Sequence, residues 1–204
     1  MAIKSLARST VRQAQRNNSA LAGYESNYFH HLETVRLGGN ASSVEFTNLA
    51  RYNDFQHLQI RIVGATDRAG DWLDFLYLRF NNDSSANYAT HRLFAEGTTI
   101  ASGAFTSQTS IIRAFYVKGA NGTASSFGAG VMDILDPFET TKNTTTRVLT
   151  GYVDASPTSE TIVAFMSGLW MSTAAVTSIT LASVNSANFI AGSRFSLYGL
   201  KARA

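Results

Sequence analysis

Cysteine is absent from this chain of 204 residues, so the chain can form neither a disulfide bridge nor a thiolate metal site. Proline is scarce, with two residues, and charged residues make up 15% of the chain, against about 25% in a typical globular protein. No apolar run approaches the roughly 20 residues that a membrane-spanning helix needs, and the N-terminus lacks the apolar core of a secretory signal. We therefore expect no membrane partner, and a low-charge body that is partly covered by copies of itself or by neighbours.

Acidic residues are absent before Glu25, whereas four basic residues recur in that stretch at a spacing of four: Lys4, Arg8, Arg12 and Arg16. On a helical wheel Ile3, Leu6 and Val11 form an apolar stripe beside the basic one. Basic side chains near a helix N-terminus oppose the helix dipole, so the isolated helix should be weak. We expect residues 1–18 to be an arm, helical or extended, that docks on a partner surface. A solvated tail and an organellar transit peptide are the alternatives.

Charge outside this arm is balanced. The chain has 17 basic residues, four of them in the arm, and 14 acidic residues, so the remainder is close to neutral. A basic chain often indicates a nucleic-acid partner. Here only the arm is basic, and we expect no nucleic-acid binding by the body.

From Val44 onward the apolar residues alternate with polar ones, which is typical of strands. The alternation is clearest at Leu58, Ile60 and Ile62, at Leu76, Leu78 and Phe80, and at Val163, Phe165 and Leu169. Turn residues separate about eight to ten such segments, with no helical pattern between them. We predict an all-β fold, an antiparallel β-sandwich or jelly roll over residues 44–204, preceded by the arm and a connector over residues 1–43.

Residues that could carry catalysis or bind a metal do not form a recognisable motif. The four histidines, His30, His31, His57 and His91, have no ligand spacing, and we expect packed or surface side chains. Two carboxylate clusters could form a Ca²⁺ loop, but neither has the spacing of one, so solvated carboxylates are expected: Asp67, Asp71 and Asp74, and Asp133, Asp136 and Glu139. We therefore predict no catalytic residue, no enzyme activity, no cofactor and no metal.

Two further features have a structural and a functional interpretation. Phe127-Gly128-Ala129-Gly130 resembles part of a phosphate loop, but no helix or lysine follows, so a strand bulge or close strand packing is expected. Trp170 lies in an apolar strand and is expected in the core. Trp72 lies in a turn beside Asp71 and is a candidate contact for a receptor sugar.

Several segments, in order and spacing, resemble a β-sandwich module of tailed-bacteriophage virion proteins. They are residues 52–61 (YNDFQHLQIR), 78–87 (LRFNNDSSAN), 88–92 (YATHR), 127–136 (FGAGVMDILD), 167–172 (SGLWMS), 175–181 (AVTSITL) and 195–201 (FSLYGLK). The resemblance covers most of the chain and leaves the arm outside. It implies a structural component of a tail fibre, a tail tip or a head decoration, often a trimer, without catalytic residues.

The resemblance and the arm together predict a virion structural protein. We expect a homotrimer that docks on the particle through Ile3, Lys4, Leu6, Arg8, Val11, Arg12 and Arg16, as a head decoration (cement) protein or a short tail fibre. Its docking partner would be the major capsid protein or a tail adaptor. The alternative is a carbohydrate-binding module of a tail fibre that recognises a host surface glycan. A jelly-roll hydrolase is the third and weakest hypothesis.

Overall fold

The computed structural model describes residues 29–154 and 161–201. The arm and residues 155–160 therefore lie outside the described part of the chain. The described residues form twelve strands and one short 3-10 helix: β1 (Phe29–Arg36), β2 (Ser43–Phe46), η1 (Leu49–Tyr52), β3 (His57–Gly64), β4 (Leu73–Phe80), β5 (Tyr88–Glu96), β6 (Thr99–Gln108), β7 (Ile111–Lys118), β8 (Gly128–Leu135), β9 (Thr144–Val153), β10 (Thr161–Trp170), β11 (Ile179–Ser183) and β12 (Arg194–Leu200). Within this part, no helix is long and apolar enough to cross a membrane.

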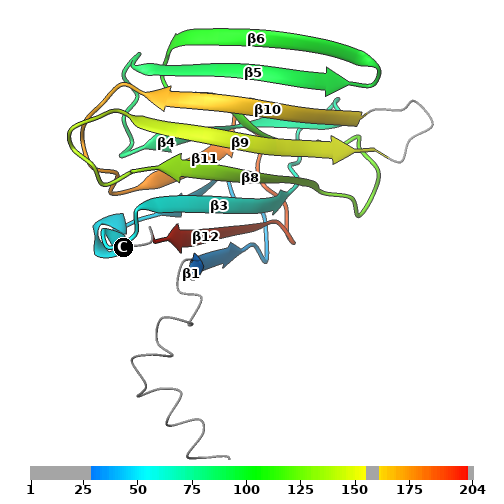
Figure 1. The fold of residues 1–204 in the computed structure, drawn as a ribbon. Helices are drawn as coiled ribbons and strands as arrows, with labels where there is room; N and C mark the ends of the chain where they lie inside the picture. The colour runs from blue at the N-terminus through cyan, green and yellow to red at the C-terminus, as the bar shows by residue number, and fades with distance from the viewer. Residues whose placement is uncertain (1–28, 155–160, 202–204) are drawn as a thin grey trace, which may run out of the picture.

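The strands form two antiparallel sheets that pack face to face (Figure 1). The larger sheet has eight strands in the order β1-β12-β3-β8-β9-β10-β5-β6, and the smaller has four in the order β2-β11-β4-β7. The predicted all-β antiparallel sandwich is confirmed. Because the larger sheet has twice as many strands, β5 and β6 extend to one end of the molecule (Figure 1).

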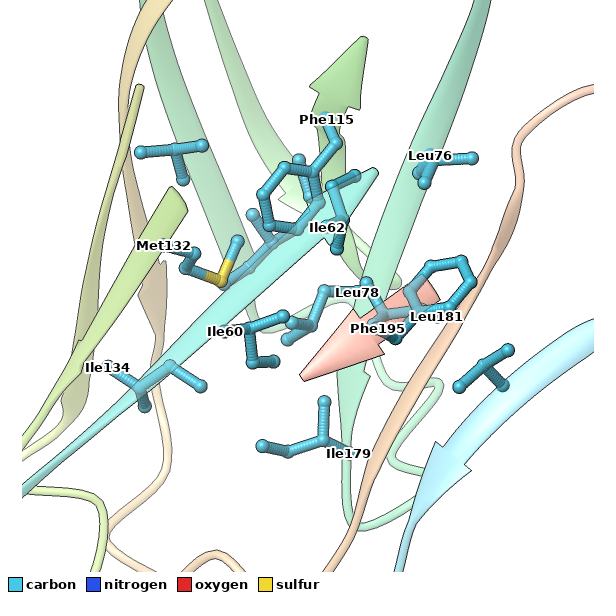
Figure 2. Packing of buried hydrophobic residues seen from close by; sticks show 14 of the residues in the cluster. Ile60, Ile62, Leu76, Leu78, Phe115, Met132, Ile134, Ile179, Leu181 and Phe195 are labelled. Atoms are coloured by element: carbon cyan, nitrogen blue, oxygen red, sulfur yellow. The ribbon is translucent and has the colours of Figure 1, made fainter. Parts of the chain in front are cut away.

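The core lies between the two sheets and explains the period-two pattern. Ile60 and Met132 of the larger sheet pack toward Leu78 and Leu181 of the smaller one (Figure 2), and all four are fully buried. Full burial of one such side chain stabilises the fold by about 1.5–3 kcal/mol relative to exposure. The alternating segments of β3 and β4 are thus explained by one covered face of each strand, whereas all five residues of β11 are buried.

The glycines of β8 allow the sheets to approach closely. A Cβ atom at Gly128 would lie 2.6 Å from the carbonyl oxygen of Tyr116, and one at Gly130 would lie 2.5 Å from the ring of Phe115. Both contacts are with β7, across the sandwich. Close strand packing, rather than a phosphate loop, is therefore confirmed for Gly128-Ala129-Gly130.

The first strand begins earlier than the sequence predicts. β1 lies within the predicted connector and pairs antiparallel with β12 at the edge of the larger sheet. Its polar sequence, FHHLETVR, obscures the alternation, because an edge strand with half-exposed faces needs few apolar residues. The connector's Tyr24 and Tyr28 lie outside the described residues.

The long strand β10 has its apolar faces reversed relative to the sequence prediction. The prediction grouped Val163, Phe165 and Leu169 as the apolar side of this strand. In the structure the covered face carries Ile162, Ala164, Met166 and Trp170, whereas Val163 and Phe165 are exposed. Both faces of the strand are apolar, so alternation alone does not identify the covered one.

The prediction that the carboxylates of the first acidic cluster are solvated and lie in a loop is wrong for Asp74. It lies in β4 and is completely buried. Its carboxylate accepts hydrogen bonds from Thr66 Oγ1 at 2.8 Å, Ser183 Oγ at 2.7 Å and Asn185 Nδ2 at 2.7 Å, and from the backbone N–H of Phe75 at 2.8 Å. A buried carboxylate with four donors is a structural tie between segments that are distant in the sequence.

Trp170 is buried in the core, as the sequence predicts, with 2% of its surface exposed. Its ring lies against Phe80 and Tyr88, and its Nε1–H donates to Asp83 at 2.8 Å. Asp83 also accepts from the side chain of Asn87 and the backbone of Ser85. These hydrogen bonds, that from Asn87 first, hold the pKa of Asp83 well below its usual value.

We expect Asp83→Ala to lower the free energy of unfolding by about 1–3 kcal/mol at pH 7, because Trp170 Nε1–H loses a charged acceptor inside the protein. The folded-state pKa is depressed, so the carboxylate's contribution is complete above the unfolded pKa of about 3.9 and is lost as the pH falls below it. Urea titrations at pH 7, 4 and 2.5 should show the difference between wild type and variant shrinking toward acid. A difference that stays constant over this range would contradict the prediction.

Candidate functional site

The outer face of the eight-stranded sheet carries most of the exposed apolar surface. Of the ten large apolar side chains that are exposed in the described part of the chain, seven lie together there. We call this surface the apolar face and define it by Val63, Leu93, Ile100, Leu149, Val153, Val163 and Phe165. Phe165 is 59% exposed and Leu93 52%. Such a concentration of apolar surface marks an interaction site, whereas scattered single residues do not.

The strand register aligns these side chains across the sheet. Phe165 of β10 lies between Leu93 of β5 and Leu149 of β9 as direct cross-strand partners. Leu149 in turn lies opposite Val131 of β8. Directly opposite residues of antiparallel strands point to the same face and contact each other. Four neighbouring strands of the sheet, the consecutive β8, β9 and β10 together with β5, therefore supply one continuous apolar row.

A groove of about 750 Å³ runs beside this row. Its sides are apolar at Val63, Val131 and Val163. Gly151 and Ala129, which are cross-strand partners, form its floor and leave the space open because their side chains are small or absent. The groove gives the apolar face a shape into which a partner's side chains can insert.

Arginines flank one end of the groove. Arg61 and Arg194 line it, and Arg36 lies directly opposite Arg194 on the neighbouring strand. Neither Arg36 nor Arg194 forms an ion pair with a described residue. Like charges directly opposite each other destabilise a sheet. This end of the face therefore favours an acidic partner group over a basic one.

A second, polar groove of about 540 Å³ lies near the 3-10 helix, at Asp54, Asp136, Lys142 and Lys201. Its charges are paired, Asp136 with Lys142 and Asp54 with Lys201. Burial alone would raise the pKa of Asp136, but hydrogen bonds from Lys142 and Gln56 outweigh it and lower the pKa. The hydrogen bond to Asp136 raises the pKa of Lys142. Both pKa values move further from pH 7, whereas a general acid or base needs a pKa close to the pH at which it works.

Two histidines contact residues that line this groove: His57 contacts Asp136, and the His30 ring lies edge-on to Phe55. The backbone N–H of Asp136 donates to His57 Nδ1 at 3.0 Å, so this ring nitrogen acts as an acceptor. The neighbouring pair His30 and His31 lies on β1, and His91 lies on the outer face of β5. Among the described residues no group of three or more His, Asp or Glu side chains converges to hold a metal ion.

The predicted docking residues Ile3, Lys4, Leu6, Arg8, Val11, Arg12 and Arg16 all lie outside the described residues. The predicted receptor contact, Trp72, is half-buried, and its ring stacks on Tyr152 with 5.9 Å between centroids. One side of the Trp72 ring is thus occupied. The glycan-contact hypothesis depends on this single, partly covered side chain and stays a prediction.

Sequence reasoning did not identify the apolar face. The available signal was the uninterrupted apolar run Ile162 to Met166, in which both faces of the strand are apolar. Such a run is typical of a strand covered on both sides. The structure covers one side only, and the second side forms the middle of the apolar face.

Comparison of the chain with protein-family models gives no match. A search of curated proteins likewise finds no similar sequence. The resemblance to a bacteriophage module therefore stays a prediction from the sequence motifs.

Proposed function

We propose that this protein is a virion structural subunit whose β-sandwich associates with copies of itself through the apolar face. The observation that carries the proposal is the continuous apolar row Leu93, Phe165, Leu149 and Val131 on a surface that a monomer leaves in water. Phe165, Leu93 and Leu149 are already about half covered in the single chain, so covering the rest of each would stabilise an assembly by about 1 kcal/mol per side chain. No catalytic arrangement among the described residues competes with this interpretation.

The proposed assembly is a homotrimer, and the N-terminal arm attaches it to the particle. The trimer and the jelly-roll connectivity rest on the resemblance to virion modules. The attachment rests on the basic and apolar stripes of residues 1–18. The arm is poorly suited to the apolar face itself, because Arg36, Arg61 and Arg194 would repel it. A different virion surface, on the major capsid protein or a tail adaptor, is the proposed site for the arm.

We expect Phe165→Asp to abolish the trimer while the body stays folded. The side chain is 59% exposed in the single chain, so an Asp there costs little in folding, whereas at an interface the same carboxylate would be buried. Light scattering at micromolar concentration should give wild type a mass of three 22.1 kDa chains or a multiple of three. The variant should have a mass of no more than two chains.

Val184→Asp is the matched control. Val184 is also an exposed apolar residue, at 38%, but it lies just after β11, outside the apolar face. We expect this variant to keep the wild-type mass. A wild-type mass of one chain, or a Phe165→Asp variant that keeps the wild-type mass, would overturn the proposed use of the apolar face.

A further inference from the structure

The strand β6 ends the eight-stranded sheet and has no neighbour on its outer side in the described part of the chain (Figure 1). It is ten residues long, TIASGAFTSQ, and contains no charged residue and no proline. An open, long and uncharged edge strand is a template for pairing with another strand. Proteins ordinarily protect such edges with charges, prolines, bulges or a covering segment.

The other three sheet edges carry such protection. β1 has charged and polar side chains, including Glu33 and Arg36, and a bulge between His31 and Glu33. β2 is only four residues long and contains Glu45. β7 is mostly buried beneath the larger sheet, where the backbone N–H of Tyr116 donates to Thr150 Oγ1 at 3.1 Å. β6 has a register irregularity near its end, where Ser107 has a positive φ of 54°, but residues 99–105 pair regularly with β5. This regular stretch of β6 is therefore the edge that the fold leaves available.

The turn before β6 determines which backbone groups point outward. β5 and β6 are joined by the two-residue turn Gly97-Thr98, with a positive φ of 56° at Gly97, as a type II′ hairpin requires. In such a turn the residue after the loop, Thr99, hydrogen-bonds back to Glu96. Alternate residues then face β5, so Ile100, Ser102 and Ala104 direct their N–H and C=O groups to the open side.

We propose that β6 pairs antiparallel with β6 of a second copy of this chain, across a twofold axis at Ser102. In this register Ser102 lies opposite Ser102 of the second copy, and Ile100 lies opposite Ala104 of the second copy. The outward groups of these three positions match, which gives about six hydrogen bonds between the two strands. The pair would join two eight-stranded sheets into one continuous sheet.

The side chains of β6 fit this pairing on both faces. On the outer face the large Ile100, 76% exposed, would lie beside the small Ala104 of the second copy. On the inner face Ala101 would lie opposite Gly103 and Phe105 opposite Thr99, so each pair combines a larger side chain with a smaller one. No like charges are brought together, because the strand has none. The twofold contact uses the backbone edge of β6, whereas the proposed trimer contact uses side chains of the apolar face, and of the residues that define that face only Ile100 lies on β6. The twofold contact does not depend on the trimer contact.

The test uses the full chain with Phe165→Asp, which removes the proposed trimer contact, and adds charges at Ser102. We expect Phe165→Asp alone to sediment as a dimer, and Phe165→Asp with Ser102→Lys as a monomer, because two lysines would lie directly opposite each other. The double variant with Ser102→Glu should also be a monomer. An equimolar mixture of the Lys and Glu variants should form the dimer again.

Hydrogen exchange gives a second measurement that a folding defect would not reproduce. In the dimer the amides of Ile100, Ser102 and Ala104 should exchange at least about tenfold more slowly than in the Lys variant. The amides of Ala101 and Gly103, which bond to β5, should exchange alike in both. A Phe165→Asp protein that is monomeric at micromolar concentration, a dimer that Ser102→Lys leaves intact, or rapid exchange at the three outward amides would each overturn the proposal.

Discussion

Replacing Asp74 by Ala should lower the free energy of unfolding by about 3–5 kcal/mol, since it removes the acceptor of a fully buried hydrogen-bond cluster. Thr66 and Ser183 would each keep a buried hydroxyl with no carboxylate to receive its hydrogen bond, and the exposed Asn185 would lose its acceptor. Thr66 follows β3 of the larger sheet, whereas Ser183 ends β11 of the smaller sheet and Asn185 follows it, so the loss affects the packing of both sheets at one corner. Urea unfolding followed by tryptophan fluorescence measures the change.

Asp54→Ala is the control for the Asp74 prediction. Its carboxylate is 56% exposed and pairs with Lys201 at 2.9 Å on the surface. A surface ion pair contributes about 0–1 kcal/mol, so this variant should unfold close to wild type. If Asp74→Ala costs no more than Asp54→Ala, the buried cluster does not stabilise the fold in the way the hydrogen bonds indicate.

Deleting residues 1–18 should abolish attachment of the protein to the particle and leave the body folded. The described fold begins at Phe29, so none of its strands is removed by the deletion. The arm can bury Leu6 and Val11 against its partner, which is worth about 1.5–3 kcal/mol for each side chain. Purified protein would be mixed with particles that lack it, and the bound copies counted after sedimentation. This prediction rests on the proposed function.

The charges of the arm should act in a salt-dependent way. Replacing Lys4, Arg8, Arg12 and Arg16 together by Gln should weaken attachment strongly at low salt and little at high salt. The reason is screening, because the Debye length falls from about 10 Å at 0.1 M salt to about 3 Å at 1 M. A matched control changes Ser5, Ser9 and Gln13 to Ala, at the same spacing of four on another side of the helical wheel. It should attach like wild type.

Attachment of the truncated protein at wild-type occupancy would show that the arm is a solvated tail. The docking surface would then have to lie on the body, where the arginine end of the groove and the apolar face are the strongest candidates. Equal loss of attachment at low and high salt in the four-Gln variant would show that the positive charges of the wild-type arm do not attract it to the particle.

The sequence by itself determined the fold class and part of the core. Alternation at Leu58, Ile60 and Ile62 predicts strands with one covered side, and the structure confirms it. The glycines at positions 128 and 130 predict close packing, because only a residue without a side chain lets another strand approach so near. These features depend on residues within one strand, so they can be read along the chain.

Only the tertiary structure decided which faces and edges are left open. β10 is apolar on both sides, and its covered side depends on where the smaller sheet lies. Asp74 is buried because Thr66, Ser183 and Asn185 converge on it from distant positions. β6 has few large apolar residues, and its open edge follows from the order of strands in the sheet. A period in the sequence records how polarity alternates, whereas burial depends on neighbours that only long-range pairing brings together.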